Sequence, residues 1–117
     1  MNSLDITVKR AMLYDFYGEL LTAHQKEIYE SLVLDDVAPV EIANLNGISR
    51  QSVHELIKRC DKILLEYEEK LHLVEKFDKT RELVNSINNL TKQFKITHDD
   101  ECIDNILVIS EEILDNM

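Results

Sequence analysis

Apolar residues recur every three or four positions from the start of the chain, which is the spacing of an amphipathic helix. Residues 5–21 carry the first such stripe. Thr22 and Gln25 then form the pattern of a capping box, in which each side chain satisfies a free backbone N–H of a second helix. That helix should end near Leu34, and Pro39 suits the first turn of a third helix. The stripes consist of Val8, Met12, Leu13, Phe16, Tyr17, Leu20 and Leu21, and then of Ile28, Tyr29, Leu32 and Val33.

The spacing over residues 39–59 is more specific than simple amphipathicity and fits a helix-turn-helix unit. In such a unit the small Ala43 lets the second helix cross closely, and Gly47 adopts the positive φ of the tight turn. Ser49 is then the N-cap of the second helix. The apolar side chains that fill the angle between the two helices are Ile48, Val53 and Leu56.

A competing interpretation is that two short helices merely pack across a glycine turn, as happens in many helical proteins. Asn46 favours this alternative, because the residue before the turn glycine is often apolar and buried in a helix-turn-helix. Local charge favours the helix-turn-helix, since residues 49–62 carry a net charge of +2 and the rest of the chain −12. The outward positions hold side chains able to reach base edges and phosphates, namely Ser49, Arg50, Gln51, His54, Glu55 and Lys58.

The apolar stripe of the helix that begins after Ser49 continues beyond Leu56 as far as Phe77. It predicts one helix of roughly thirty residues, about 40 Å long. A head of three short helices is too small to bury that length. Either the C-terminal segment folds back on the long helix, or a second copy of the chain packs along it, or both.

Two more helical stretches follow, and residues 85–91 within the first of them are polar enough to contain a break. The last helix begins near Thr97, whose hydroxyl can cap it. We therefore expect a helix-turn-helix domain over residues 1–78 that includes the long helix. A helical C-terminal extension over residues 79–117 should pack on the long helix or on a dimer mate.

Composition supports this fold and limits the classes of function. The 117 residues include two Gly and one Pro, too few for sandwiches or barrels, so an all-α protein is expected. The formal charge of −10 disfavours a general electrostatic grip on nucleic acid or anionic membrane, so any DNA contact must be local. Because the chain lacks an apolar run of about eighteen residues and a signal peptide, we expect a cytoplasmic protein without membrane contact.

Motifs for catalysis and cofactor binding are missing from the sequence. It contains no phosphate-binding loop, dinucleotide fingerprint, hydrolase elbow or zinc-protease motif. The four His and two Cys lack metal-ligand spacing. We therefore expect no enzyme activity, no cofactor and no metal. The four tyrosines fall within apolar stripes, so core packing is preferred over a stacking platform for bases.

Several runs resemble the YlxM family of small bacterial helix-turn-helix proteins, which are similar to region 4 of sigma factors. The resemblance covers roughly residues 8–77. It implies an all-α fold with a sigma region 4-like head, a long fourth helix and C-terminal helices. It also implies a homodimer and a role in, or regulation of, the signal recognition particle pathway. The matching runs are Asp15-Phe16-Tyr17, Leu20-Leu21-Thr22 with Gln25, Leu34-Asp35-Asp36, Glu41-Ile42-Ala43, Ile48-Ser49-Arg50-Gln51, Ile57-Lys58-Arg59 and Tyr67-Glu68-Glu69-Lys70-Leu71.

The resemblance also marks the start of the recognition helix at Ser49-Arg50-Gln51 and its basic continuation at Lys58-Arg59. Three positions depart from the family pattern. An aromatic residue usually stands at the place of His54, alanine at that of Ser52, and an apolar residue at that of Asn46. These differences concern base specificity more than the fold.

We therefore predict a non-enzymatic regulatory protein that binds DNA as a dimer through its recognition helix. We expect Arg50, Gln51 and His54 to read bases. Lys58, Arg59 and Lys62 should contact phosphates. The alternative is a protein-interaction adapter that keeps the helix-turn-helix shape and binds a basic partner, such as a signal-recognition-particle protein, without DNA. The predicted DNA-binding set is Ser49, Arg50, Gln51 and His54, together with Lys58, Arg59 and Lys62.

Overall fold

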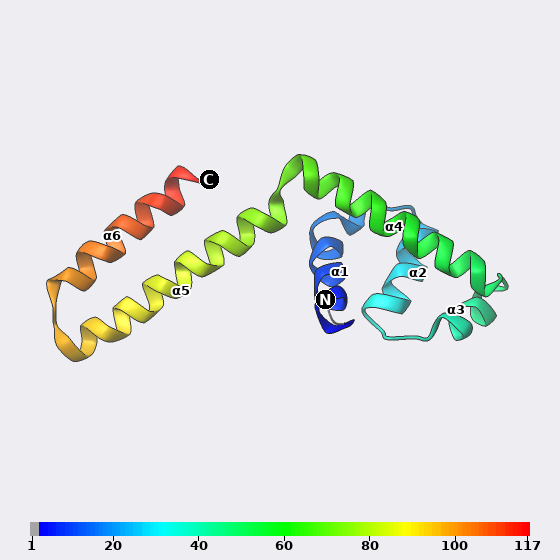
Figure 1. Ribbon diagram of the computed structural model, residues 1–117, viewed down its shortest axis with the longest axis horizontal. Coiled ribbons are helices and arrows are strands. Elements are labelled where there is room, and N and C mark those ends of the chain that lie inside the picture. The colour runs from blue at the N-terminus through cyan, green and yellow to red at the C-terminus, as the bar shows by residue number, and fades with distance from the viewer. Residues whose placement is uncertain (1–2) are drawn as a thin grey trace. The chain divides into compact units, whose positions relative to one another are not determined.

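The computed structural model describes residues 3–117, and every regular element within them is a helix. This confirms the predicted all-α class. By its contacts the chain divides into two compact units, Met1–Val74 and Glu75–Met117. The elements in Figure 1 are α1 (Ser3–Tyr17), the 3₁₀ turn η1 (Gly18–Leu20), α2 (Ala23–Val33), α3 (Pro39–Asn46), α4 (Arg50–Leu71), α5 (Leu73–Thr97) and α6 (Asp100–Asp115).

In the first unit, α1, α2 and α3 pack against α4 and enclose one hydrophobic core. On the predicted face of α2, Ile28, Tyr29 and Val33 are buried and Leu32 is half-buried. On α1, however, only part of the stripe points inward: Leu13 and Tyr17 are buried, whereas Val8 and Phe16 stay exposed. The apolar arc of α1 is therefore wider than the face that the head covers. The fully buried side chains are Tyr17, Ile28, Tyr29, Ile42, Val53, Cys60 and Leu64.

The helix ends in the head follow the predicted capping chemistry. Thr22 Oγ1 accepts the backbone N–H of Gln25 at 3.2 Å, and Gln25 Oε1 accepts that of Thr22 at 2.9 Å. Pro39 is the first residue of α3, as its fixed φ and missing N–H favour. These local signals confirm where α2 and α3 begin.

A partly buried polar cluster around Asp61 ties α4 to α1 and α2. The guanidinium of Arg10 on α1 donates to both carboxylate oxygens, at 3.2 and 2.8 Å. The hydroxyl of Tyr29 on α2 donates to the same carboxylate at 2.6 Å. Burial, and then the hydrogen bond to Asp61, raise the pKa of Tyr29 well above its ordinary value, so the phenol stays neutral and donates. This cluster fixes how α4 lies on the head.

The prediction of one helix running to Phe77 is wrong, because α4 ends at Leu71 and the next residue adopts a left-handed conformation, His72 with φ 56°. The buried Tyr17 hydroxyl donates to Glu68 and accepts the backbone N–H of Leu73 at 3.1 Å. Glu68 in turn accepts the backbone N–H of Val74 at 3.0 Å. These bonds satisfy free N–H groups at the start of α5, so the chain turns without losing them.

In the second unit, α5 runs unbroken, and residues 85–91 contain no break in spite of their polarity. Polar hydroxyls in that region bond to carbonyls one turn back, as Thr91 does to Ile87 at 2.8 Å, and the helix continues. The predicted cap of the last helix is wrong. Thr97 ends α5, and Asp99 caps α6 by accepting the N–H of Glu101 at 3.0 Å.

Candidate nucleic-acid interface

The helix-turn-helix consists of α3, a three-residue turn and the first turns of α4. Gly47 ends α3 with φ 66° and ψ 31°, a left-handed conformation that glycine adopts without a Cβ clash. Ser49 is the N-cap of α4, and its Oγ accepts the backbone N–H of Ser52 at 3.0 Å. Ala43 and Val53 are buried where the helices cross. The roles predicted for this turn, its cap and its packing residues are confirmed.

Asn46 fits the unit in spite of its polarity. Its side-chain amide donates to the carbonyl of Ile42 at 2.8 Å, so the half-buried group satisfies a free carbonyl near the end of α3. A polar residue before the turn glycine is therefore compatible with the helix-turn-helix.

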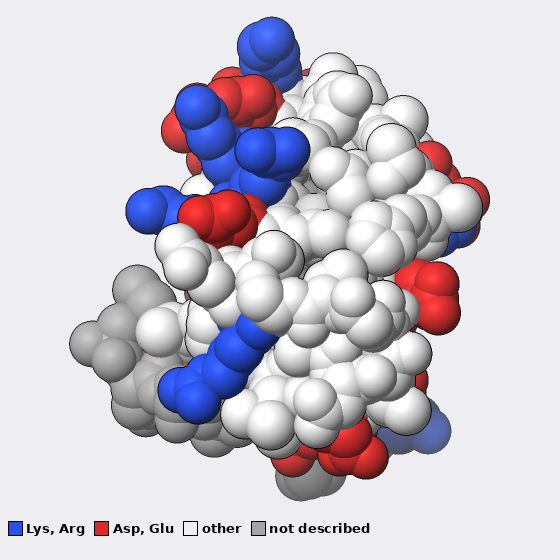
Figure 2. Space-filling view, turned by 90° about the vertical axis from the view of Figure 1, so that its right-hand side faces the viewer, with Lys and Arg blue, Asp and Glu red and all other residues white. Residues whose placement is uncertain are grey.

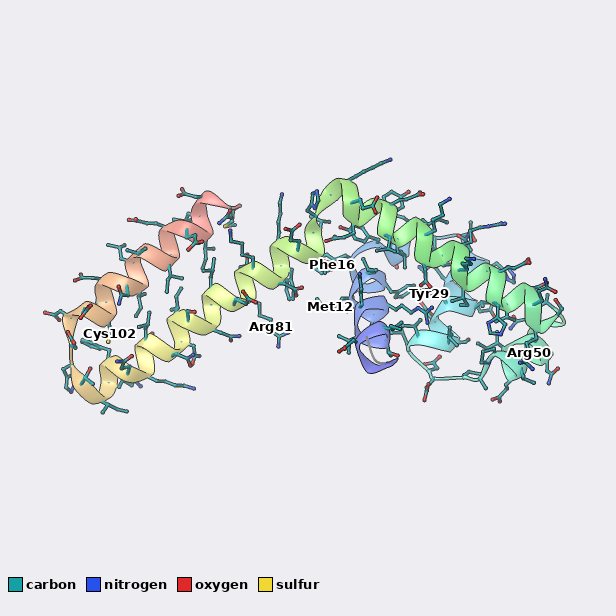
Figure 3. All side chains as sticks on the ribbon, viewed as in Figure 1. Met12, Phe16, Tyr29, Arg50, Arg81 and Cys102 are labelled. Carbon is teal, nitrogen blue, oxygen red and sulfur yellow. The ribbon has the colours of Figure 1, made fainter. Side chains whose placement is uncertain are left out.

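All seven members of the predicted DNA-binding set are exposed. Ser49 caps α4 and the other six lie on it, and Figure 3 shows Arg50 at the first turn of this helix. A shallow hollow of about 380 Å³ is lined by Arg50, Gln51, His54, Glu55 and Lys58. A neighbouring hollow of about 940 Å³ adds Arg59 and Lys62.

Acidic side chains are interleaved with this basic surface. Figure 2 shows the end of the head that carries the start of α4, where Lys and Arg side chains gather in one part of the view with Asp and Glu between them. Glu55 lines both hollows, and its carboxylate accepts a hydrogen bond from Gln51 Nε2 at 3.4 Å. The larger hollow also includes Asp61, Glu66 and Glu69. The surface is therefore mixed in charge.

The structure adds residues that sequence reasoning did not include. Arg59 also lines a hollow with Thr22, His24 and Gln25, which come from the N-terminal end of α2, and with Ser52. Exposed backbone and hydroxyl groups at a helix start are suited to contact phosphate. No local pattern could have placed these residues beside α4, because the contact depends on how α2 packs.

Among the described residues, no group of three or more His, Cys, Asp or Glu side chains could hold a metal ion. None of the described helices is both long and apolar enough to cross a membrane.

Residues 4–105 match the family UPF0122, described as "Putative helix-turn-helix protein, YlxM / p13 like". The chain belongs to this family. The resemblance to YlxM proteins is thus confirmed, and the match extends beyond residue 77 into the C-terminal helices. The UPF0122 description names the helix-turn-helix and no enzyme activity.

Several UPF0122 relatives match over most of their length. The UPF0122 protein of Clostridium botulinum (strain Alaska E43 / Type E3) is 42% identical over 94 residues, covering 80% of this chain and 86% of that protein. The UPF0122 protein YlxM of Bacillus subtilis (strain 168) is 41% identical over 93 residues, covering 80% and 84%. A UPF0122 protein of Geobacillus sp. (strain WCH70) is 39% identical over 108 residues, covering 92% and 97%.

Proposed function

We propose that this UPF0122 protein is a non-enzymatic cytoplasmic regulator that binds DNA as a homodimer, through the first turns of α4. One observation carries the proposal. Arg50, Gln51, His54 and Lys58 line one exposed hollow at the start of the second helix of a helix-turn-helix. In this motif, that part of the helix enters the major groove.

The side-chain types suggest separate roles. Arg50 can bond a guanine edge with two N–H groups, and Gln51 can do the same with adenine. Glu55 lines the same hollow and can accept a hydrogen bond from the amino group of cytosine, which gives the acidic residue a use in base recognition. His54 completes the surface that would read bases.

Phosphate contacts fall to Lys58, Arg59 and Lys62, which line the neighbouring hollow. Since the protein carries a formal charge of −10, these local contacts must supply the electrostatic attraction. Three phosphate contacts per copy give a logarithmic salt dependence of about −3 per copy. The proposal therefore predicts a modest affinity for DNA that depends only weakly on salt concentration.

The roles can be tested by fluorescence anisotropy with a duplex selected from random DNA and a scrambled duplex. Arg50→Ala should weaken binding to the selected duplex by roughly 1–3 kcal/mol and leave binding to the scrambled one nearly unchanged. Lys58→Ala should weaken both and reduce the salt slope by about one. Lys70→Ala is the matched control, because Lys70 is exposed in the last turn of the same helix. Equal effects of Arg50→Ala and Lys70→Ala would refute the assigned roles.

A second candidate is supported by the exposed acidic members of the larger hollow, which are Glu55, Glu66 and Glu69. They favour an adapter that binds a basic protein partner, and the YlxM resemblance suggests a component of the signal recognition particle. Attraction of this kind weakens as salt rises. Salt-sensitive capture of the purified signal-recognition-particle protein, unaffected by Arg50→Ala and Lys58→Ala, would favour the adapter over the DNA-binding protein.

A further inference from the structure

The second unit lacks a core of its own. Within Glu75–Met117, all of which the structure describes, Cys102 is the one side chain that is buried. Two helices with so little burial are marginally stable in water, because most helical stability in proteins comes from tertiary packing. The α5–α6 hairpin therefore needs a cover.

Each helix of the hairpin carries two neighbouring stripes. The inner stripe of α5 is half-buried and consists of Leu83, Ile87, Leu90 and Phe94. The inner stripe of α6 consists of Cys102, Ile106, Ile109 and Ile113, which are buried or half-buried. Each helix also has a second stripe, whose residues each come one position after a residue of the inner stripe. On both helices the second stripe is therefore rotated in the same direction about the helix axis. On α5 it is Val84, Asn88, Thr91 and Lys95, and on α6 it is Ile103, Leu107, Ser110 and Leu114.

The two second stripes lie on the same side of the hairpin. The helices run antiparallel (Figure 1), and the ion pair between Lys79 and Glu112 at 3.9 Å shows which parts of the two helices lie opposite each other. The two helices point in opposite directions, and their inner stripes face each other. The same rotation away from the inner stripe therefore brings both second stripes to the same side of the hairpin. We call this side the free face. On α6 it presents a ridge of large apolar side chains, with Leu107 57% and Leu114 68% exposed.

The α5 half of the free face is hollowed and basic. A depression of about 390 Å³ is lined by Val84, Ile87, Asn88, Thr91, Lys92 and Lys95. Helical periodicity also places Arg81 at the edge of the free face. The acidic residues Asp78 and Glu82 lie farther around the helix, outside this face.

The α6 half of the free face is acidic. This helix carries six Asp and Glu and no Lys or Arg. Four of the acids, Asp100, Asp104, Glu111 and Asp115, follow the exposed apolar ridge around the helix and therefore flank it. One chain thus supplies both a ridge with acidic borders and a hollow with basic borders.

We propose that the free face is a self-association surface, on which the α5–α6 hairpin of a second copy of the chain docks. This inference names the surface through which the proposed homodimer forms. It rests on the proposed function only in requiring a second copy of the chain. A two-fold axis parallel to the helices sets α6 of each copy against α5 of the other. The exposed Leu107 then fills the hollow on the partner's α5, and four helices enclose a common core.

Charge selects this arrangement over the alternative. With the axis parallel to the helices, Arg81 faces the acids at the end of α6, and Lys92 and Lys95 face Asp100 and Asp104 at its start. A two-fold axis across the helices would instead set α6 against α6, with like charges opposed.

The test is the mass of the full-length protein in solution without DNA, by sedimentation velocity, so that DNA binding has no part in it. The wild-type chain of 13.7 kDa should sediment as a dimer. Leu107→Glu should raise the dimer dissociation constant by about a hundredfold or more, because it buries an unpaired charge. Val108→Glu is the matched control. Val108 is 62% exposed and one residue away, but it lies on another side of α6, so this variant should stay dimeric.

Charge-exchange variants distinguish the loss of this interface from a general loss of folding. Lys92→Glu/Lys95→Glu and Asp100→Lys/Asp104→Lys should each be monomeric with helical circular dichroism retained. An equimolar mixture should form the dimer again, because each acidic surface then meets a basic one. A monomeric wild type, a dimeric Leu107→Glu variant, or a mixture of folded charge variants that stays monomeric would each overturn the proposal.

Discussion

Removing the Tyr29 hydroxyl tests whether the Asp61 cluster holds the recognition helix on the head. The Tyr29 side chain, labelled in Figure 3, is fully buried, and its hydroxyl donates to Asp61 at 2.6 Å. Tyr29→Phe keeps the ring, which stacks on Tyr14 with 5.7 Å between centroids. It also leaves both hydrogen bonds from Arg10 to Asp61 in place. The change therefore removes one hydrogen bond and little packing.

The magnitude follows from the charge of the acceptor. A hydrogen bond to an ionised group contributes about 1.5–3 kcal/mol, so Tyr29→Phe should lower the free energy of unfolding by about 2 kcal/mol. Asp61→Ala should have the larger effect, about 3 kcal/mol, because it leaves a buried hydroxyl and the Arg10 guanidinium without their acceptor. We place this value at the low end because the Asp61 and Arg10 side chains are still 27% and 32% exposed.

The assay is urea denaturation of both single variants and the double variant. The four tyrosines lie in Met1–Val74 and the chain has no Trp, so near-ultraviolet circular dichroism of tyrosine reports on the head alone. The double variant should lose less stability than the sum of the single variants, since both remove the same bond. A loss below about 0.5 kcal/mol for Tyr29→Phe, or strict additivity, would refute the cluster's role.

Four further predictions concern two glycines, the helix junction and alkaline pH. Gly47→Ala should lower the free energy of unfolding by about 1–2 kcal/mol, since φ is 66° but a Cβ meets open space. Gly18→Ala should lower it by about 3 kcal/mol, because its Cβ would lie 2.8 Å from a packed tyrosine ring; equal losses in urea denaturation would contradict this. Tyr17→Phe should speed hydrogen exchange at the Leu73 amide, which loses its acceptor, and unchanged exchange would argue against the junction. Burial raises the pKa of the Cys60 thiol from 9.0 to about 11, which favours its neutral form in the folded state. Stability should therefore be level below pH 9 and fall as the pH rises towards 11, and a constant urea midpoint across that window would contradict the assignment.

Features with local causes could be predicted from the sequence. Thr22, Pro39, Gly47 and Ser49 act on backbone groups within a few residues, so their positions marked the helix ends correctly. The helical period also predicted that Val53 points into the core and that the DNA-binding set is exposed.

Features with distant causes could not be predicted in this way. The apolar stripe runs through His72, and the Tyr17 hydroxyl that supports the break there comes from α1. The polar stretch over residues 85–91 suggested a break, but its hydroxyls bond within the helix. Likewise, only packing brings Thr22 and Gln25 of the α2 end beside Arg59.

The most direct test of DNA binding through α4 is selection from a random DNA pool at two salt concentrations. Wild-type protein and the variant Arg50→Ala/Gln51→Ala/Lys58→Ala are compared in parallel, each checked for folding by circular dichroism. The account predicts that the wild type enriches a motif with two symmetric halves and that the triple variant enriches none. The same motif enriched by both proteins, or no motif enriched by a folded wild type, would contradict it.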